Sequence, residues 1–255
     1  MNLETMHFEK DGRIGRLTLN RPQLLNAMNY QGSLDMNRMA EMIRDDPDLK
    51  LVLIRGAGRA FCTGIDLKQL QAGETPHEYY EKWDRALRIL EQAEKVLICA
   101  MQGYALGGGL QLALACDIRI ATEDCQLGLP ATKEGIIPGL GTFRLPRYIG
   151  LGRAKWMALS GENVDGRRAY EIGLVDHVVK PDTFDQEVNV LVEKYSRTCS
   201  EGSRQSKALL SLAFDMPHGQ FFEEYLRRQR IAMASPDHQE AMSAYREGRD
   251  PAFSD

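Results

Sequence analysis

The stretch VLICAMQGYALGGGLQLALACD occupies residues 96–117. Its first six residues are apolar and predict a buried strand, and its Ala- and Leu-rich second half predicts a helix that begins directly after three glycines. Glycines let the backbone approach a ligand closely because no Cβ lies in the way. The first N–H groups of a helix lack partners and lie at the positive end of its dipole. The stretch therefore predicts a site for a negatively charged oxygen.

A second turn of the same type lies upstream. Residues 51–56, LVLIRG, predict a buried strand, and the sequence GRAFCTGIDL follows at residues 58–67. Three glycines on their own are explained by close packing of a helix on a strand. Two strand–glycine–helix turns instead favour a site in which each turn offers one backbone amide to the same oxygen.

The composition is that of a globular domain. The chain has 255 residues, of which 43% are hydrophobic and 27% charged, and this length fits one large domain or a core with a small appendage. The net charge of −4 gives no reason to expect a nucleic acid partner. We also expect no membrane span, no signal peptide and a cytoplasmic location.

The five cysteines are an odd number without metal-ligand spacing, and most lie in apolar surroundings. We interpret them as reduced packing residues and expect no bound metal. Cys62 lies in the upstream glycine turn, where a nucleophile is conceivable, but no histidine is near it in the sequence. We therefore assign Cys62 to packing.

Periodicity predicts an α/β core followed by a helical C-terminal part. Alternation over residues 5–20 around Asp11-Gly12 predicts a β-hairpin, and helical spacing predicts a helix over about 77–94. Strands are expected near residues 50–55, 96–101, 117–121 and 126–129, alternating with helices. From residue 184 to residue 246, apolar positions at helical spacing predict helices alone.

These motifs resemble the crotonase family, also called the enoyl-CoA hydratase/isomerase family. The resemblance rests on AFCTGIDL at residues 60–67 and GYALGGG at residues 103–109. It extends over nearly the whole chain through NRP at 20–22, NA at 26–27, GIIPG at 135–139, RRAY at 167–170, GLV at 173–175 and the stretch from Glu240 to Phe253.

The resemblance implies a fold and an assembly. The implied fold is α/β, a crotonase-like spiral of ββα turns with a C-terminal helical region that builds a trimer. On this basis residues 1–180 form the spiral core that binds acyl-CoA, and residues 181–255 form the oligomerisation region. The expected assembly is a homotrimer, or a hexamer made of two trimers.

The resemblance also implies the chemistry. In the family, two backbone amides hold the carbonyl oxygen of an acyl-CoA thioester, and here those amides belong to Ile65 and Gly108. Coenzyme A enters as part of the substrate thioester, and no permanently bound cofactor is implied. Residues implied to line the coenzyme A are Leu24, Cys62, Gly64, Ile65, Asp66 and Gly108.

The acid–base positions depart from the family pattern. Family hydratases have one glutamate two residues after the triple glycine, where this chain has Gln111, and a second directly after a proline, where Ala131 follows Pro130. An amide and a methyl group cannot exchange a proton near neutral pH. We therefore expect a variant reaction rather than two-glutamate hydration.

Two nearby residues have two interpretations each. Glu134 lies three residues after Ala131, so on a helical or 3₁₀ turn its carboxylate faces the same pocket; otherwise it is a solvated residue beside Lys133. Gln111 either orients a water or the acyl group, or is a satisfied polar residue at a helix start.

The leading function is thus acyl-CoA processing of the enoyl-CoA hydratase/isomerase type, in which backbone amides stabilise a thioester enolate. One alternative is a non-catalytic acyl-CoA-binding or sensor protein, and another is a family thioester or C–C hydrolase or a decarboxylase. A nucleotide-binding Rossmann domain is the weakest alternative, because Gly107-Gly108-Gly109 lacks the Gly-x-Gly-x-x-Gly order of that domain.

Overall fold

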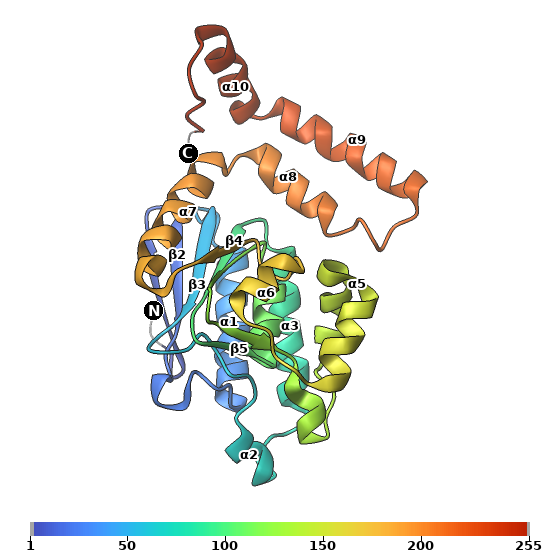
Figure 1. The fold of residues 1–255 in the computed structure, drawn as a ribbon. Helices are drawn as coiled ribbons and strands as arrows, with labels where there is room; N and C mark the ends of the chain where they lie inside the picture. The colour runs from blue at the N-terminus through green and yellow to red at the C-terminus, as the bar shows by residue number, and fades with distance from the viewer. Residues whose placement is uncertain (1–2, 254–255) are drawn as a thin grey trace.

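A six-stranded sheet forms the centre of the fold in the computed structural model, which describes residues 3–253 (Figure 1). Its strand order is β1-β2-β3-β4-β6-β8. β1 and β2 pair antiparallel and confirm the predicted hairpin, and the further pairings in this sheet are parallel. The strands span Met6–Asp11 (β1), Ile14–Leu19 (β2), Leu51–Gly56 (β3), Val96–Met101 (β4), Ile118–Thr122 (β6) and His177–Val179 (β8).

A second, two-stranded parallel sheet runs beside the first. It pairs β5 (Tyr104–Leu106) with β7 (Gln126–Gly128), so β4 and β5, and then β6 and β7, each contribute one strand to each sheet. A bridge between Cys62 and Ala105 continues the same pairing to the segment after β3. This repetition, with a helix after each pair of strands, is the crotonase-like spiral of ββα turns that the sequence predicted.

α-Helices and short 3₁₀ turns surround the sheets. Some of the α-helices pack on the core, and others extend away from it. The α-helices span Tyr30–Asp45 (α1), Leu67–Gln71 (α2), Glu78–Gln92 (α3), Gly108–Leu114 (α4), Gly141–Ser160 (α5), Gly166–Glu171 (α6), Phe184–Thr198 (α7), Glu201–Leu210 (α8), His218–Ala234 (α9) and Pro236–Glu247 (α10). The 3₁₀ turns span Pro22–Leu24 (η1), Pro130–Glu134 (η2) and Pro181–Thr183 (η3).

The large sheet is buried on both faces, which explains why the first four residues of β3 are apolar. Val52 and Ile54 point into the main core, with the apolar faces of α1, α3 and α4. Leu51 and Leu53 point to the opposite face and pack against α7. A parallel strand covered on both faces reads as a continuous apolar run because neither side meets water. The apolar runs of β3 and β4 therefore fix the position of the two glycine turns that follow them.

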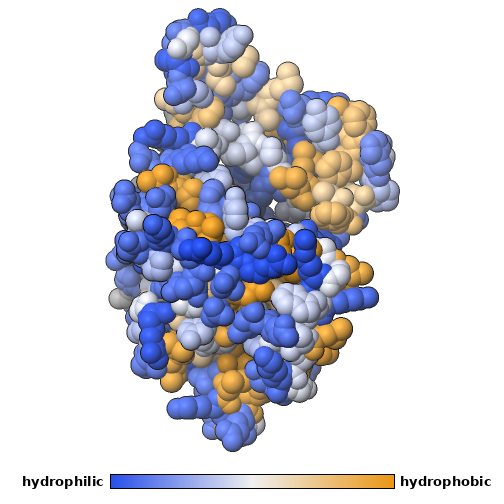
Figure 2. All heavy atoms as spheres, in the orientation of Figure 1, coloured by the Kyte–Doolittle hydropathy of each residue, from blue (hydrophilic) through white to orange (hydrophobic). Residues whose placement is uncertain are grey.

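The C-terminal part divides after α7. α7 packs on the sheet through Phe184, Val188, Leu191 and Val192, so it covers the core. α8, α9 and α10 extend away from the core at the top of Figure 1. No residue of α9 is buried, and apolar side chains gather on this part of the surface (Figure 2). The apolar side chains exposed there include Leu210, Phe214, Phe222, Met233 and Tyr245.

Among residues 3–253, no helix has the length and apolar character needed to cross a membrane.

Candidate active site

The two glycine turns predicted from the sequence touch each other. A Cβ placed on Gly64 would lie 2.9 Å from the backbone nitrogen of Gly108, and one placed on Gly109 would lie 2.3 Å from the carbonyl oxygen of Cys62. Such separations leave no room for a side chain. Gly64 and Gly107 also have positive φ angles of 91° and 52°, which L-residues rarely adopt. Glycine is required because backbone contacts backbone here.

The N–H groups of Ile65 and Gly108 are left without hydrogen bonds at this contact. Met28 donates its N–H to the carbonyl of Gly64 and accepts the N–H of Asp66, so the N–H of Ile65 between them points the other way. Gly108 is the first residue of α4 and has no carbonyl partner one turn earlier. Neither N–H has an acceptor within residues 3–253, and both residues line one cavity. Such a pair of donors suits a single acceptor oxygen.

The cavity beside these two N–H groups has a volume of about 590 Å³ and is mainly apolar. Its walls come from α2, α3, α4, η2 and the loop that leads into α5. A cleft of this size and character is typical of a small-molecule site. The apolar side chains in its walls include Leu67, Trp83, Ile136, Ile137, Pro138 and Leu140.

The structure brings five of the predicted site residues to this cavity. They are Ile65, Gly108, Gln111, Ala131 and Glu134. The other four residues that the resemblance associated with coenzyme A do not line it. These are Leu24 in η1, Cys62 and Gly64 in the first glycine turn, and Asp66. Asp66 caps α2 by accepting the N–H of Lys68 at 3.2 Å.

Asp66 also holds Arg21. Two nitrogens of the Arg21 guanidinium lie 3.1 Å from the same Asp66 carboxylate oxygen. Both side chains are largely buried, with exposures of 16% and 8%. This pair ties the segment at the start of η1 to the first glycine turn.

Gln111 is buried at the cavity wall without a partner for its amide. It is 8% exposed, and its side-chain oxygen would lie 3.0 Å from a Cβ on Gly139. No hydrogen bond to this amide exists in the described chain. The amide lies in the cavity wall, where it is available to a ligand. Ala131 is also buried and presents only a methyl group.

Glu134 ends η2, as the predicted 3₁₀ turn required, and its residue lies at the cavity. The side chain is exposed, and partial desolvation raises the pKa of its carboxyl, an effect that the charge of Lys133 opposes. A carboxyl with a raised pKa at a cavity is suited to proton transfer. The interpretation of Glu134 as a pocket residue therefore has support from its position.

A carboxylate outside the set of predicted site residues also lines the cavity. Asp84, on α3, accepts a hydrogen bond at 2.9 Å from Arg144 on α5. Arg144 is 2% exposed and also bonds both carboxylate oxygens of Glu91. The sequence shows an acid next to Trp83, but it does not show that this acid pairs with Arg144, because the arginine lies 60 positions further along the chain. The indole N–H of Trp83 is buried and also has no partner.

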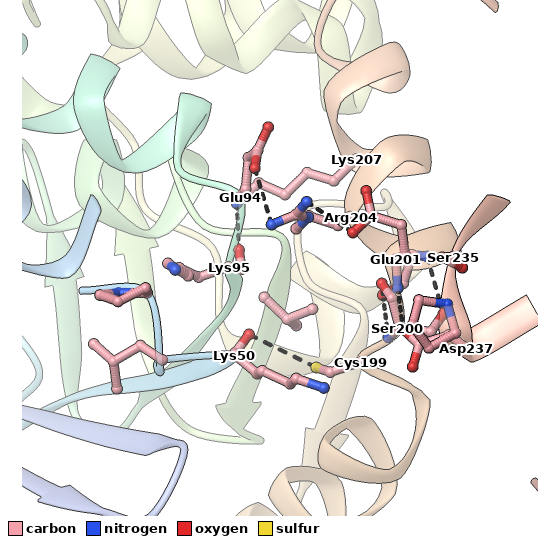
Figure 3. A pocket seen from close by; sticks show the side chains of 15 residues that line it. Lys50, Glu94, Lys95, Cys199, Ser200, Glu201, Arg204, Lys207, Ser235 and Asp237 are labelled. Atoms are coloured by element: carbon pink, nitrogen blue, oxygen red, sulfur yellow. Dashed lines mark hydrogen bonds and ion pairs between the residues drawn. The ribbon is translucent and has the colours of Figure 1, made fainter. Parts of the chain in front are cut away.

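A second cavity, of about 230 Å³, lies where α8 and α10 meet the core (Figure 3). Its charges are satisfied within the protein. Arg204 pairs with Glu94 at 3.3 Å and Glu201 at 2.7 Å, and Lys207 pairs with Asp117 at 2.8 Å. The bonds to Glu94 and Asp117 fasten α8 to the core, whereas the bond to Glu201 lies within α8, so this cavity is a structural junction and the candidate chemistry belongs to the first one.

Comparison with known proteins identifies the family. The model of the family described as enoyl-CoA hydratase/isomerase matches residues 9–255. The chain therefore belongs to the enoyl-CoA hydratase/isomerase family, the crotonase family that its motifs resemble.

Several relatives are similar over almost their full length. The chain is 35% identical over 260 residues to a protein named "Probable enoyl-CoA hydratase echA8" from Mycobacterium bovis, covering 99% of each chain. It is 32% identical to the "Crotonyl-CoA hydratase" of Syntrophomonas wolfei, also over 99% of each. Among solved structures, an enoyl-CoA hydratase from Bacillus anthracis superposes with a TM-score of 0.91 at 30% identity, covering 98% of this chain and 99% of that one.

We predict that Cys62 is chemically inert in the folded protein. The thiol is fully buried, and this burial raises its pKa to about 12, so it is protonated near neutral pH. Iodoacetamide at pH 8 should leave Cys62 unmodified in the native protein and modify it after denaturation, as mapped by mass spectrometry. Rapid native labelling at Cys62 would contradict its assignment to packing.

Proposed function

We propose that the protein is an enzyme that processes acyl-CoA thioesters, in which the N–H groups of Ile65 and Gly108 bind the thioester oxygen. The observation that carries this proposal is the pair of unbonded N–H groups at the contact of the two glycine turns. Removal of a proton next to a thioester carbonyl places negative charge on that oxygen. Fixed donors in a cavity shielded from water stabilise such charge without reorganising.

The proposal takes coenzyme A as the carrier part of the substrate and requires no permanently bound cofactor. The names of the relatives support an acyl-CoA substrate. The large apolar cavity supports an acyl group that reaches past the two N–H groups toward α3 and η2. The acyl chain itself is uncharged in this proposal, because the ionisable side chains in the wall are acids and tyrosines.

We propose further that the reaction differs from two-glutamate hydration. Gln111 and Ala131 supply no proton at the positions where family hydratases have glutamates. Glu134 takes over a general acid–base role from a shifted position, with desolvation raising the pKa of its carboxyl. The unpartnered amide of Gln111 orients the acyl group or a water beside it.

A second candidate function is non-catalytic binding of acyl-CoA, as a sensor. The absence of both usual glutamates favours it, since the two N–H groups bind a carbonyl oxygen whether or not a proton is moved. Crotonyl-CoA and a panel of acyl-CoAs, followed by absorbance and free thiol, separate the two: binding without turnover supports the sensor. Release of free thiol would instead favour a thioester hydrolase.

The exposed apolar helices support a homo-oligomer. The face of α9 and the turn before it expose Phe214 and Phe222, which are 73% and 51% exposed. Large apolar groups that gather on one surface mark an interface. We propose that α8, α9 and α10 join copies of this chain in a trimer, or in a hexamer of two trimers.

We predict that Gly108→Pro abolishes turnover. Proline fits the first position of a helix but removes the N–H that binds the oxygen, and loss of one such donor typically costs about 10²–10³-fold in rate. The matched control is Gly108→Ala, which keeps the N–H, and its Cβ would meet Trp83 at an ordinary 3.6 Å. Folded Gly108→Pro protein with near-wild-type kcat/KM would refute the assignment of this amide.

We predict that the wild-type protein hydrates crotonyl-CoA poorly and that Gln111→Glu combined with Ala131→Glu raises the rate. The two N–H donors are already in place, and each general acid–base group typically contributes about 10²–10⁴-fold. The loss of enoyl absorbance measures the rate. Efficient hydration by the unmodified protein would show that the catalytic groups lie elsewhere.

Glu134→Gln tests the shifted carboxylate separately. We predict that it lowers the native activity, because glutamine has a similar shape but exchanges no proton. Unchanged activity would assign Glu134 to the solvated surface.

We predict a particle mass in solution of three or six times the 28.7 kDa of one chain. Light scattering after size exclusion at micromolar concentration measures it. Phe214→Glu, which places a charge on the proposed interface, should shift the mass downward. A wild-type monomer would contradict the proposed assembly.

A further inference from the structure

The proposed reaction needs a group that takes a proton from the acyl carbon next to the thioester. The two N–H groups stabilise the charge that results but cannot accept a proton. Neither Gln111 nor Ala131 can accept one. The required base must therefore be sought among the other ionisable groups of the cavity wall.

Four such groups line the cavity: Asp84, Glu134, Tyr79 and Tyr80. Burial raises the pKa of Tyr79, so its hydroxyl stays protonated and is no base. Tyr80 offers a phenol hydroxyl, which donates a proton more readily than it accepts one from carbon. The carboxylates of Asp84 and Glu134 remain, and they come from two different elements of the cavity wall, α3 and η2.

Asp84 is held in a defined position. One of its oxygens accepts the hydrogen bond from Arg144, and the other has no partner within the described chain. Arg144 is itself fixed by the two bonds from its guanidinium to Glu91, at 2.6 Å and 3.1 Å. The buried arginine therefore pairs with two carboxylates and fixes the position of the Asp84 carboxylate in the cavity wall.

Asp84 shares one cavity with the two N–H groups. The indole of the preceding residue, Trp83, lies 3.6 Å from the position of a Cβ on Gly108. Trp83 and Asp84 line the same cavity as Gly108. A carboxylate that is held on a helix and has one oxygen without a partner among the described residues, in the wall of the cavity that contains the two N–H groups, is placed to act as a general base.

We propose that Asp84 is a catalytic base of this site, a role that rests on the proposed acyl-CoA function. Its free oxygen takes the proton from C2 of the acyl group. The electron pair of that C–H bond moves into the enolate, whose oxygen is held by Ile65 and Gly108. The reverse step returns the proton to C2, and Glu134 is then free to serve the other side of the cavity as an acid.

The alternative is that Asp84 only ties α3 to α5 through Arg144. Glu91 provides the matched control, since it bonds the same arginine but does not line the cavity. Asp84→Asn keeps an oxygen that accepts from Arg144 and removes the base. Glu91→Gln makes the equivalent change on the side of the arginine away from the cavity.

Exchange of the C2 protons in D₂O isolates the proposed step. Butyryl-CoA and octanoyl-CoA serve as probes, because saturated chains form the enolate and return without further reaction. Loss of the C2 proton signal is followed by NMR for the wild type and for both variants, and melting temperatures show that each variant is folded. We expect Asp84→Asn to slow exchange by about 10²-fold or more, and Glu91→Gln to stay close to the wild-type rate.

Two other results have different meanings. If the wild type exchanges C2 protons and Asp84→Asn does so equally fast, or if both variants slow equally, Asp84 is a structural tie and the proposal falls while the acyl-CoA function stands. If the wild type exchanges neither probe, the enolate chemistry itself fails, and the assignment of Asp84 fails with it.

Discussion

The close contact of two glycine turns is the constraint on which the site depends. Gly64 and Gly109 leave no room for a Cβ, so the backbone after β3 lies directly against the start of α4. This contact is possible only because β3, β4 and β6 are neighbours and parallel, which brings the ends of β3 and β4 to the same edge of the sheet. Strands buried on both faces then hold that edge rigid. The position of the N–H groups of Ile65 and Gly108 is thus a property of the whole core.

A site built from backbone amides separates two requirements that side chains usually combine. Stabilising a charged oxygen depends on where the N–H groups lie, and Ile65 serves as well as another residue whose amide is in the same place. Moving a proton depends on side chains, which can change without disturbing the strands. The family fold therefore tolerates Gln111 and Ala131 where other members have glutamates. What the fold preserves is a cavity with two donors, and what it leaves variable is the acid–base chemistry.

The sequence predicted the parts that are local. The hairpin, the strands β3 and β4 and the helix α3 each depend on neighbouring residues, and the structure has all of them. It did not predict β8, whose three residues pair only at the edge of the sheet. Nor did it show that Asp84 meets Arg144, because that contact joins residues 60 positions apart and is fixed by how α5 crosses α3. The local sequence pattern therefore locates the two N–H donors, whereas the position of the Asp84 carboxylate follows only from how the helices pack.

The charges around Arg144 explain why a carboxylate is stable at an apolar cavity. An isolated ionised acid there would pay a large desolvation cost and take up a proton instead. Arg144 offsets that cost for Asp84, and Glu91 fixes the arginine from the side away from the cavity. Glu134 has no such partner, and desolvation raises the pKa of its carboxyl. The two carboxyl groups of the cavity wall thus differ in environment: Asp84 pairs with a buried arginine, whereas desolvation raises the pKa of Glu134. A difference of this kind is what the proposed division into base and acid requires.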